Sequence, residues 1–273
     1  MPDPQAELKR MVEELRAISK VLDATPMPAL ARPDVPYKQV TEELVHWAIR
    51  VYAYSILCQF REMLRSTLIM FDSDQAPPVF LCARAMWEMS AHSYYVKKHC
   101  FQYMDKKDWQ ATWDFMLGIN EGSRYMKERQ DQPGTVANAG AAIIEELPEG
   151  PHIGRVMACF NEYFRSDEDK EPKRATEEYS FLSEFCHPNS FAFTNHIDMD
   201  KAATRGAEVK VEFVKPDKQS CIQVMPNILY GCMPLLFSMD ELLTRIGDNG
   251  FSNPASEYAK IAGPAEPDQN SKN

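Results

Sequence analysis

The stretch VFLCARAMWEMSAHSYYV at residues 79–96 decides the fold class. Within it, the only side chains that carry charge at neutral pH are Arg84 and Glu88. A helix that is apolar on nearly all sides is typical of the buried centre of a helical protein. The preceding Pro77-Pro78 pair suits a first helical turn, where a proline sacrifices no helical hydrogen bond. The stretch therefore predicts a central helix over residues 78–104, with other helices packed around it.

Apolar side chains recur at three- and four-residue steps in several other segments. The clearest is residues 4–24, where Asp3 and Pro4 form a typical helix start. The spacing predicts further helices over residues 38–71, 107–129, 152–165, 174–187 and 217–247. Apolar and charged residues alternate over 207–215, which indicates a strand, so we expect a minor β-hairpin near residues 191–215. The predicted fold class is all-α, a bundle of about six or seven helices.

Proline and polar residues divide the chain into three parts. Four prolines fall within residues 25–36 and indicate a linker behind the first helix. The tail from residue 248 is polar and contains further prolines, which favours disorder. We therefore expect an N-terminal amphipathic helix and linker at 1–36, a helical bundle domain at 37–247, and a disordered tail at 248–273.

Composition and charge exclude several classes of protein. The 273-residue chain has 44% hydrophobic residues and a formal net charge of −10. That charge opposes a broad nucleic-acid interface and attachment to an anionic membrane. Seven scattered cysteines without a C-x-x-C pair favour reduced thiols and a cytoplasmic location. We find neither a secretory signal nor a stretch of about 20 apolar residues, so no membrane partner is expected.

The two charges of the central helix are the first candidate site. Arg84 and Glu88 are four residues apart and share a helix face. Charges inside an apolar helix are costly unless they are paired and hydrogen-bonded. We expect both at the bundle interior, in a structural network or in a ligand-binding or catalytic site.

A second cluster lies at the end of the 174–187 helix. His187 precedes Pro188, and a helix C-terminus favours the protonated imidazole. Such a histidine suits general acid–base work, although it could also simply cap carbonyls. We expect His187 to share one polar pocket with Arg84 and Glu88. Further candidate ligand-binding residues are Ser183, Glu184, Asn189 and His92. His92 and His99 are seven residues apart and could align with Glu88, or serve helix packing.

Two short motifs carry a family resemblance. The helix ARAMWE at 83–88 and LSEFCHP at 182–188 resemble the R-x3-E and L-S-x3-H-P motifs of uncharacterised bacterial all-helical proteins, over roughly residues 40–235. That family is distantly similar to HEPN domains, helical bundles of toxin, defence and RNA-processing systems. Catalytic HEPN members cleave RNA with Arg-x4–6-His. The corresponding positions before His187 hold Leu182, Phe181 and Ser180, so only Arg84 could supply the cation.

A metal-binding pattern is also present. Glu-x-x-His occurs at Glu43/His46 and at Glu184/His187. Di-metal carboxylate bundles use two such motifs with carboxylates from other helices, and Glu88 could be one of these. Solvated helix faces produce the same spacing by chance.

These observations predict a helical binding or regulatory module whose polar pocket, built around Arg84, Glu88 and His187, takes a small polar or anionic ligand. One alternative is the function that the resemblance implies, a HEPN-like, metal-independent ribonuclease of a bacterial defence or stress system. A second is a di-metal carboxylate bundle. The leading interpretation needs neither a cofactor nor a metal, and the net charge disfavours RNA. The apolar stripe of residues 4–24 is a candidate homodimer surface. Whether the protein is an enzyme stays open.

Overall fold

The computed structural model describes residues 3–35, 39–121, 150–165, 173–184 and 218–248. Within these ranges it contains seven α-helices, two short 3₁₀ helices and no strand, so the all-α prediction is confirmed. The elements are α1 (Pro4–Ala24), α2 (Glu42–Asp72), α3 (Ala76–Met104), α4 (Trp109–Glu121), α7 (Ile153–Phe160), η1 (Asn161–Phe164), α8 (Arg174–Glu184), η2 (Lys218–Gln223) and α11 (Met225–Arg245). The expected β-hairpin at 191–215 lies outside the described residues.

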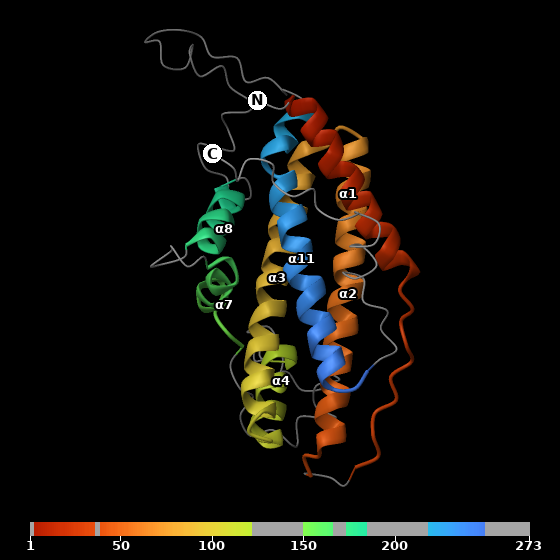
Figure 1. Cartoon of the computed structure of the whole chain (residues 1–273), viewed down its shortest axis with the longest axis vertical. Coiled ribbons are helices and arrows are strands. Elements are labelled where there is room, and N and C mark those ends of the chain that lie inside the picture. Colours follow the sequence, from red (N-terminus) through yellow and green to blue (C-terminus); the bar gives the residue numbers. More distant parts are fainter. Residues whose placement is uncertain (1–2, 36–38, 122–149, 166–172, 185–217, 249–273) are drawn as a thin grey trace, which may run out of the picture.

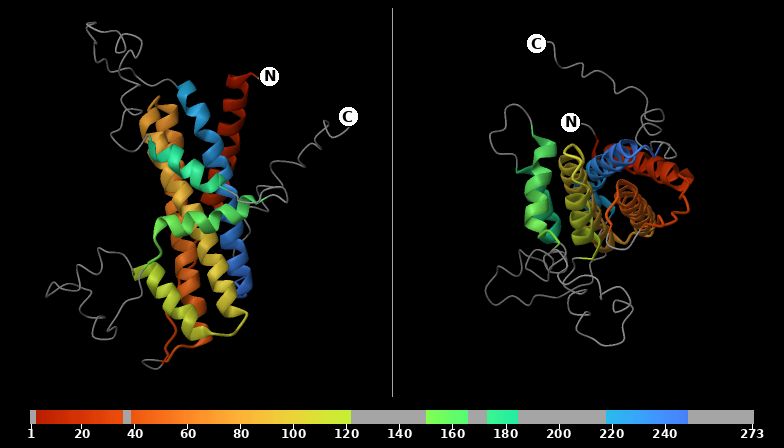
Figure 2. Two further views of the ribbon diagram at one scale, coloured as in Figure 1. Left: turned by 90° about the vertical axis from the view of Figure 1, so that its left-hand side faces the viewer. Right: turned by 90° about the horizontal axis from the view of Figure 1, so that it is seen from below.

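The long helices α2, α3 and α11 run side by side and form the body of the bundle (Figure 1). Helix α1 packs on α2 and α11, whereas α4, α7 and α8 pack on α3. The view along the bundle shows α1 on one side of this body and the α7–α8 layer on the other (Figure 2). The position predicted for the central helix is therefore confirmed for α3.

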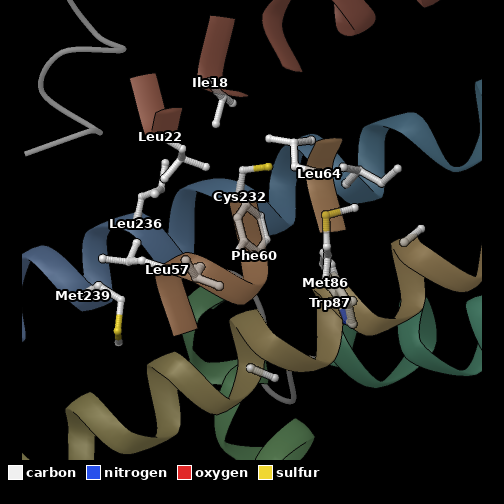
Figure 3. Close-up of a cluster of buried hydrophobic side chains, with 14 of the residues drawn as sticks. Ile18, Leu22, Leu57, Phe60, Leu64, Met86, Trp87, Cys232, Leu236 and Met239 are labelled. Atoms are coloured by element: carbon white, nitrogen blue, oxygen red, sulfur yellow. The ribbon is translucent and has the colours of Figure 1, made fainter. Parts of the chain in front are cut away.

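One continuous hydrophobic core joins α1 to the other helices. Leu15, Ile18 and Leu22 of α1 are fully buried, and Figure 3 shows Ile18 and Leu22 in one cluster with side chains of α2 and α11. The stripe on which we based the homodimer is thus covered within its own chain, and the dimer itself stays a prediction. The predicted boundary at residue 36 lies outside the described residues.

Helix starts follow the local sequence closely. The Asp3 carboxylate accepts a hydrogen bond from the Gln5 amide at 3.0 Å, and the Thr41 hydroxyl accepts one from the Leu44 amide at 3.2 Å. Each bond satisfies an amide that the first helical turn leaves without a partner. Helix α4 begins later than expected, because Lys107 has a positive φ of 54° and the Asp108 carboxylate caps the Ala111 amide.

Helices α3 and α11 approach closely at a glycine. A Cβ atom on Gly231 would lie 3.3 Å from Cε3 of Trp87 and 3.4 Å from Oγ of Ser90. The Ser90 hydroxyl donates to the Gly231 carbonyl at 2.6 Å. Glycine therefore permits both the close backbone approach and a buried hydrogen bond between the two helices.

Trp87 also holds the α7–α8 layer against α3. Its indole Nε1–H donates to the Ala175 carbonyl of α8 at 3.1 Å. Its ring stacks on Phe164 at a centroid distance of 5.7 Å and meets Phe160 edge-on at 5.5 Å. Within the layer, the Asn161 amide group donates to the Thr176 hydroxyl and accepts from the Thr176 backbone amide.

Two sequence expectations about the C-terminal region need correction. Residues Cys221–Arg245 are long and apolar enough to cross a membrane, although 61% of the most apolar window is buried inside the protein. Core helices of soluble proteins have the same character. Of the tail predicted to be disordered, residues 249–273 lie outside the described residues, and at Asp248 the carboxylate accepts hydrogen bonds from Arg50 at 3.1 Å and Tyr54 at 3.4 Å. The folded region therefore includes Asp248, because the two bonds compensate its charge.

Six cysteines lie in the described residues, and none is in a disulfide. Burial raises the pKa values of Cys100 and Cys232, which keeps both thiols protonated and unreactive at neutral pH. The reading of these six cysteines as free thiols is confirmed.

Candidate functional site

Arg84 and Glu88 form the ion pair that their spacing predicts, with Arg84 Nε 3.1 Å from Glu88 Oε1. Their side chains remain 24% and 33% exposed. The two side chains are therefore partly buried, and neither is fully enclosed in the bundle interior. Trp87 and Met86 occupy the inward face of α3, so the pair falls at the edge of that face, where water still reaches both charges.

Helix α8 supplies the partner of this pair, although through a residue that the sequence did not single out. The Arg84 Nη2 group donates to the Tyr179 hydroxyl at 2.9 Å, and Cζ lies 5.2 Å from the centre of the tyrosine ring. The guanidinium thus contacts both a carboxylate and an aromatic face. We call Arg84, Glu88 and Tyr179 the α3–α8 link.

The structure describes only some of the other residues that were predicted for this site. The Ser183 hydroxyl donates to the Tyr179 carbonyl at 2.7 Å, one turn back on α8. Glu184 is exposed at the end of the same helix. His187 and Asn189 lie outside the described residues, so whether His187 shares a pocket with Arg84 stays a prediction.

His92 follows Glu88 by one turn on α3. Burial lowers the pKa of His92 more than the nearby Glu88 carboxylate raises it, which favours the neutral imidazole. Arg84, Glu88 and His92 thus form one row on α3, with the ion-paired end against α8. The geometry suits a structural connection between two helices.

The metal alternative has no complete donor set in the described ranges, where no group of three or more His, Cys, Asp or Glu side chains is close enough to hold an ion. In the first Glu-x-x-His motif, His46 Nε2 lies 3.8 Å from the preceding Glu42 carboxylate. The second motif includes His187, which the structure does not describe.

A hollow of about 600 Å³ lies elsewhere, between α3, α4 and the start of α7. We call it the α3–α4–α7 hollow. Its walls carry aromatic, basic and acidic groups together with small residues that leave space between them. Its lining comprises Tyr95, His99, Tyr103, Ala111, Asp114, Phe115, Gly118, Ile119, Gly150, Pro151, His152 and Arg155. Neither Arg84 nor Glu88 contributes to it.

Four rings form one side of this hollow. Tyr95, His99 and Tyr103 repeat at four-residue steps on α3 and so share one face. The His99 ring lies 4.3 Å from Tyr95 and 5.3 Å from Phe115 of α4, between centroids. Tyr103 and Phe115 are 6.0 Å apart. These distances are typical of mutually packed rings, which form a rigid wall.

The α7 edge of the hollow supplies a cation and a second imidazole. Arg155 is exposed, and no carboxylate of the described residues lies within ion-pair distance of it. The His152 ring caps α7, with Nδ1 accepting from the Gly154 amide at 3.1 Å. A neutral imidazole that accepts through Nδ1 carries its proton on Nε2, so this atom can donate to another group.

Charge in the hollow is unevenly distributed. Burial lowers the pKa of His99, and the positive charges of Arg155 and Lys98 lower it further, which favours a neutral ring. The Asp114 carboxylate on α4 already accepts a hydrogen bond from Gln110 Nε2 at 2.9 Å. Arg155 is therefore the charged group of the hollow that has no charged or hydrogen-bonded partner in the described part of the chain.

Sequence reasoning missed this hollow. The recurrence of Tyr95, His99 and Tyr103 was visible as a helical stripe, but aromatic stripes more often belong to a core. The contributions of Phe115 and Arg155 depend on how three helices meet, which periodicity does not reveal.

Comparisons with protein-family models, with curated proteins and with solved structures found no match to this chain.

Proposed function

We propose that this protein is a helical ligand-binding module and that the α3–α4–α7 hollow is its binding site. The class of function is the one that the sequence favours, but the site differs from the predicted polar pocket. We place the site in the hollow because Arg84 and Glu88, the described part of the predicted pocket, form a partly exposed ion pair that Tyr179 connects to α8.

One observation carries the proposal. Four packed rings face a hollow of about 600 Å³ at whose edge Arg155 has no carboxylate partner among the described residues. Pockets for small molecules are typically 300–1,000 Å³, largely apolar or aromatic, with a few polar groups that orient the ligand. The α3–α4–α7 hollow falls within this size range, and its lining combines four aromatic rings with several polar and charged groups.

The test is a fragment screen by saturation-transfer NMR, with aromatic fragments of positive, negative and zero charge. Ala111 lines the hollow, so Ala111→Trp should fill it and reduce binding of any hit about tenfold or more. Ala158 is exposed on α7 and does not line the hollow, so Ala158→Trp is the matched control and should retain binding.

A second measurement uses the unaltered chain and does not depend on the folding of a variant. Hits should shift the methyl resonances of Ala111 and Ile119, which line the hollow. The methyl resonances of Ile69, which is exposed on α2, should stay unchanged. If no fragment binds at millimolar concentration, or if hits leave both lining methyls unchanged, the proposed function is wrong.

A further inference from the structure

We infer that the ligand of the α3–α4–α7 hollow is a planar aromatic carboxylate, with its ring on the tyrosine–histidine–phenylalanine wall and its carboxylate at the α7 edge. The inference rests on the proposed function and specifies the chemistry of the ligand.

The wall selects for a flat, polarisable group. Tyr95, His99, Tyr103 and Phe115 present ring faces and edges within 4.3–6.4 Å of one another. Aromatic groups gain more from such surroundings than aliphatic groups of the same area, because stacked and edge-on contacts add to burial. Ala111 and Gly118, which flank Phe115 on the α4 face that lines the hollow, have small side chains and so leave space beside the rings.

The α7 edge selects for a carboxylate. The guanidinium of Arg155 presents parallel N–H groups that match both oxygens of a carboxylate. His152 lies three residues earlier, and its capping tautomer directs a proton-bearing Nε2 away from the helix end. The first turn of an eight-residue helix adds a positive potential at the same place.

Asp114, the acidic group of the hollow, favours a cationic ligand less than Arg155 favours an anionic one. Asp114 is exposed and accepts a hydrogen bond from Gln110, one turn earlier on α4. A ligand cation at Asp114 would have to compete with that bond and with water. A ligand anion at Arg155 would instead provide the counter-charge that no described carboxylate supplies.

The experiment compares three probes of the same shape by isothermal titration calorimetry: 2-naphthoate, 2-naphthylmethanol and 2-naphthylmethylamine. Because charge-assisted bidentate bonds are stronger than neutral ones, 2-naphthoate should bind the parent protein about tenfold more tightly than the alcohol. The amine should bind no better than the alcohol. Arg155→Gln should abolish the preference for the carboxylate while the alcohol retains its affinity.

Arg165 provides the matched control. It is exposed at the end of η1, outside the hollow, so Arg165→Gln should leave the carboxylate preference unchanged. Equal affinities of the parent for the carboxylate and the alcohol, or tighter binding of the amine, would overturn the inference and leave the proposed binding site standing. Failure of all three probes, together with a screen without hits, would remove both.

Discussion

Replacing Trp87 with phenylalanine tests how the α7–α8 layer is attached to the bundle. Trp87 is fully buried, and three of its contacts depend on the indole: the bond to the Ala175 carbonyl, the stack on Phe164 and the edge contact with Phe160. A phenyl ring lacks the N–H donor and leaves part of the indole volume empty.

The magnitude follows from these contacts. A buried hydrogen bond contributes about 0.5–1.5 kcal/mol and an aromatic pair a similar amount, and the cavity adds to both. We therefore expect Trp87→Phe to lower the free energy of unfolding by about 2–4 kcal/mol. Amides of α8 (Arg174–Glu184) should lose protection from hydrogen exchange more than those of α2, because only α8 loses its anchoring bond.

Urea unfolding and hydrogen-exchange mass spectrometry measure these two effects. Trp113→Phe is the control, since Trp113 is only half-buried and its indole makes no hydrogen bond within the described ranges. It should cost about 1 kcal/mol or less. The reasoning is refuted if Trp87→Phe costs no more than Trp113→Phe, or if α8 keeps the exchange protection that it has in the parent.

Three further outcomes are expected. Gly231→Ala should lower the free energy of unfolding by about 1–3 kcal/mol in thermal or urea unfolding, because the added Cβ meets Trp87 at 3.3 Å; an unchanged value would contradict the close α3–α11 packing. A double-mutant cycle of Arg84→Met with Tyr179→Phe should give a coupling of about 0.5–1 kcal/mol, and zero coupling would mean that the α3–α8 link does not stabilise the fold. The free energy of unfolding should also fall as pH decreases below about 6.5, because histidines of the unfolded chain then bind protons that the buried histidines of the folded chain do not. Urea midpoints should therefore decrease as the pH is lowered, and a flat profile would contradict the lowered pKa values. The histidines whose pKa burial lowers are His46, His92 and His99.

Much of the fold was predictable because apolar periodicity reports which helix face is buried. Helix α1 has the predicted bounds, since Asp3 supplies a cap and Thr25 begins a proline-rich stretch. The helix predicted over residues 217–247 is divided in the structure into η2 and α11, and Pro226 lies in the first turn of α11. Pro234, in contrast, stays inside α11, where buried packing on α3 outweighs the loss of one backbone donor.

The candidate site was predictable only as far as single helices determine it. The Arg84–Glu88 ion pair follows from four-residue spacing, and the structure contains it. Its exposure and its contact with Tyr179 depend on the angle at which α8 crosses α3, which no local pattern encodes. The α3–α4–α7 hollow could not be predicted from local sequence patterns either, because the surroundings of His99 come from two other helices.

The way α1 is attached has a practical consequence. It inserts a buried apolar face, with Leu15 and Ile18 at its middle, yet residues 26–35 that leave it form no regular structure. Cutting the chain within 26–35 would leave a short peptide held on the remaining protein by its apolar face and by the ion pairs Arg16–Asp72 and Asp23–Arg65, without a covalent link. Its retention would then depend on concentration. The protein is therefore a natural candidate for a split reporter, in which residues 3–24 added in trans restore the missing segment of an otherwise assembled acceptor.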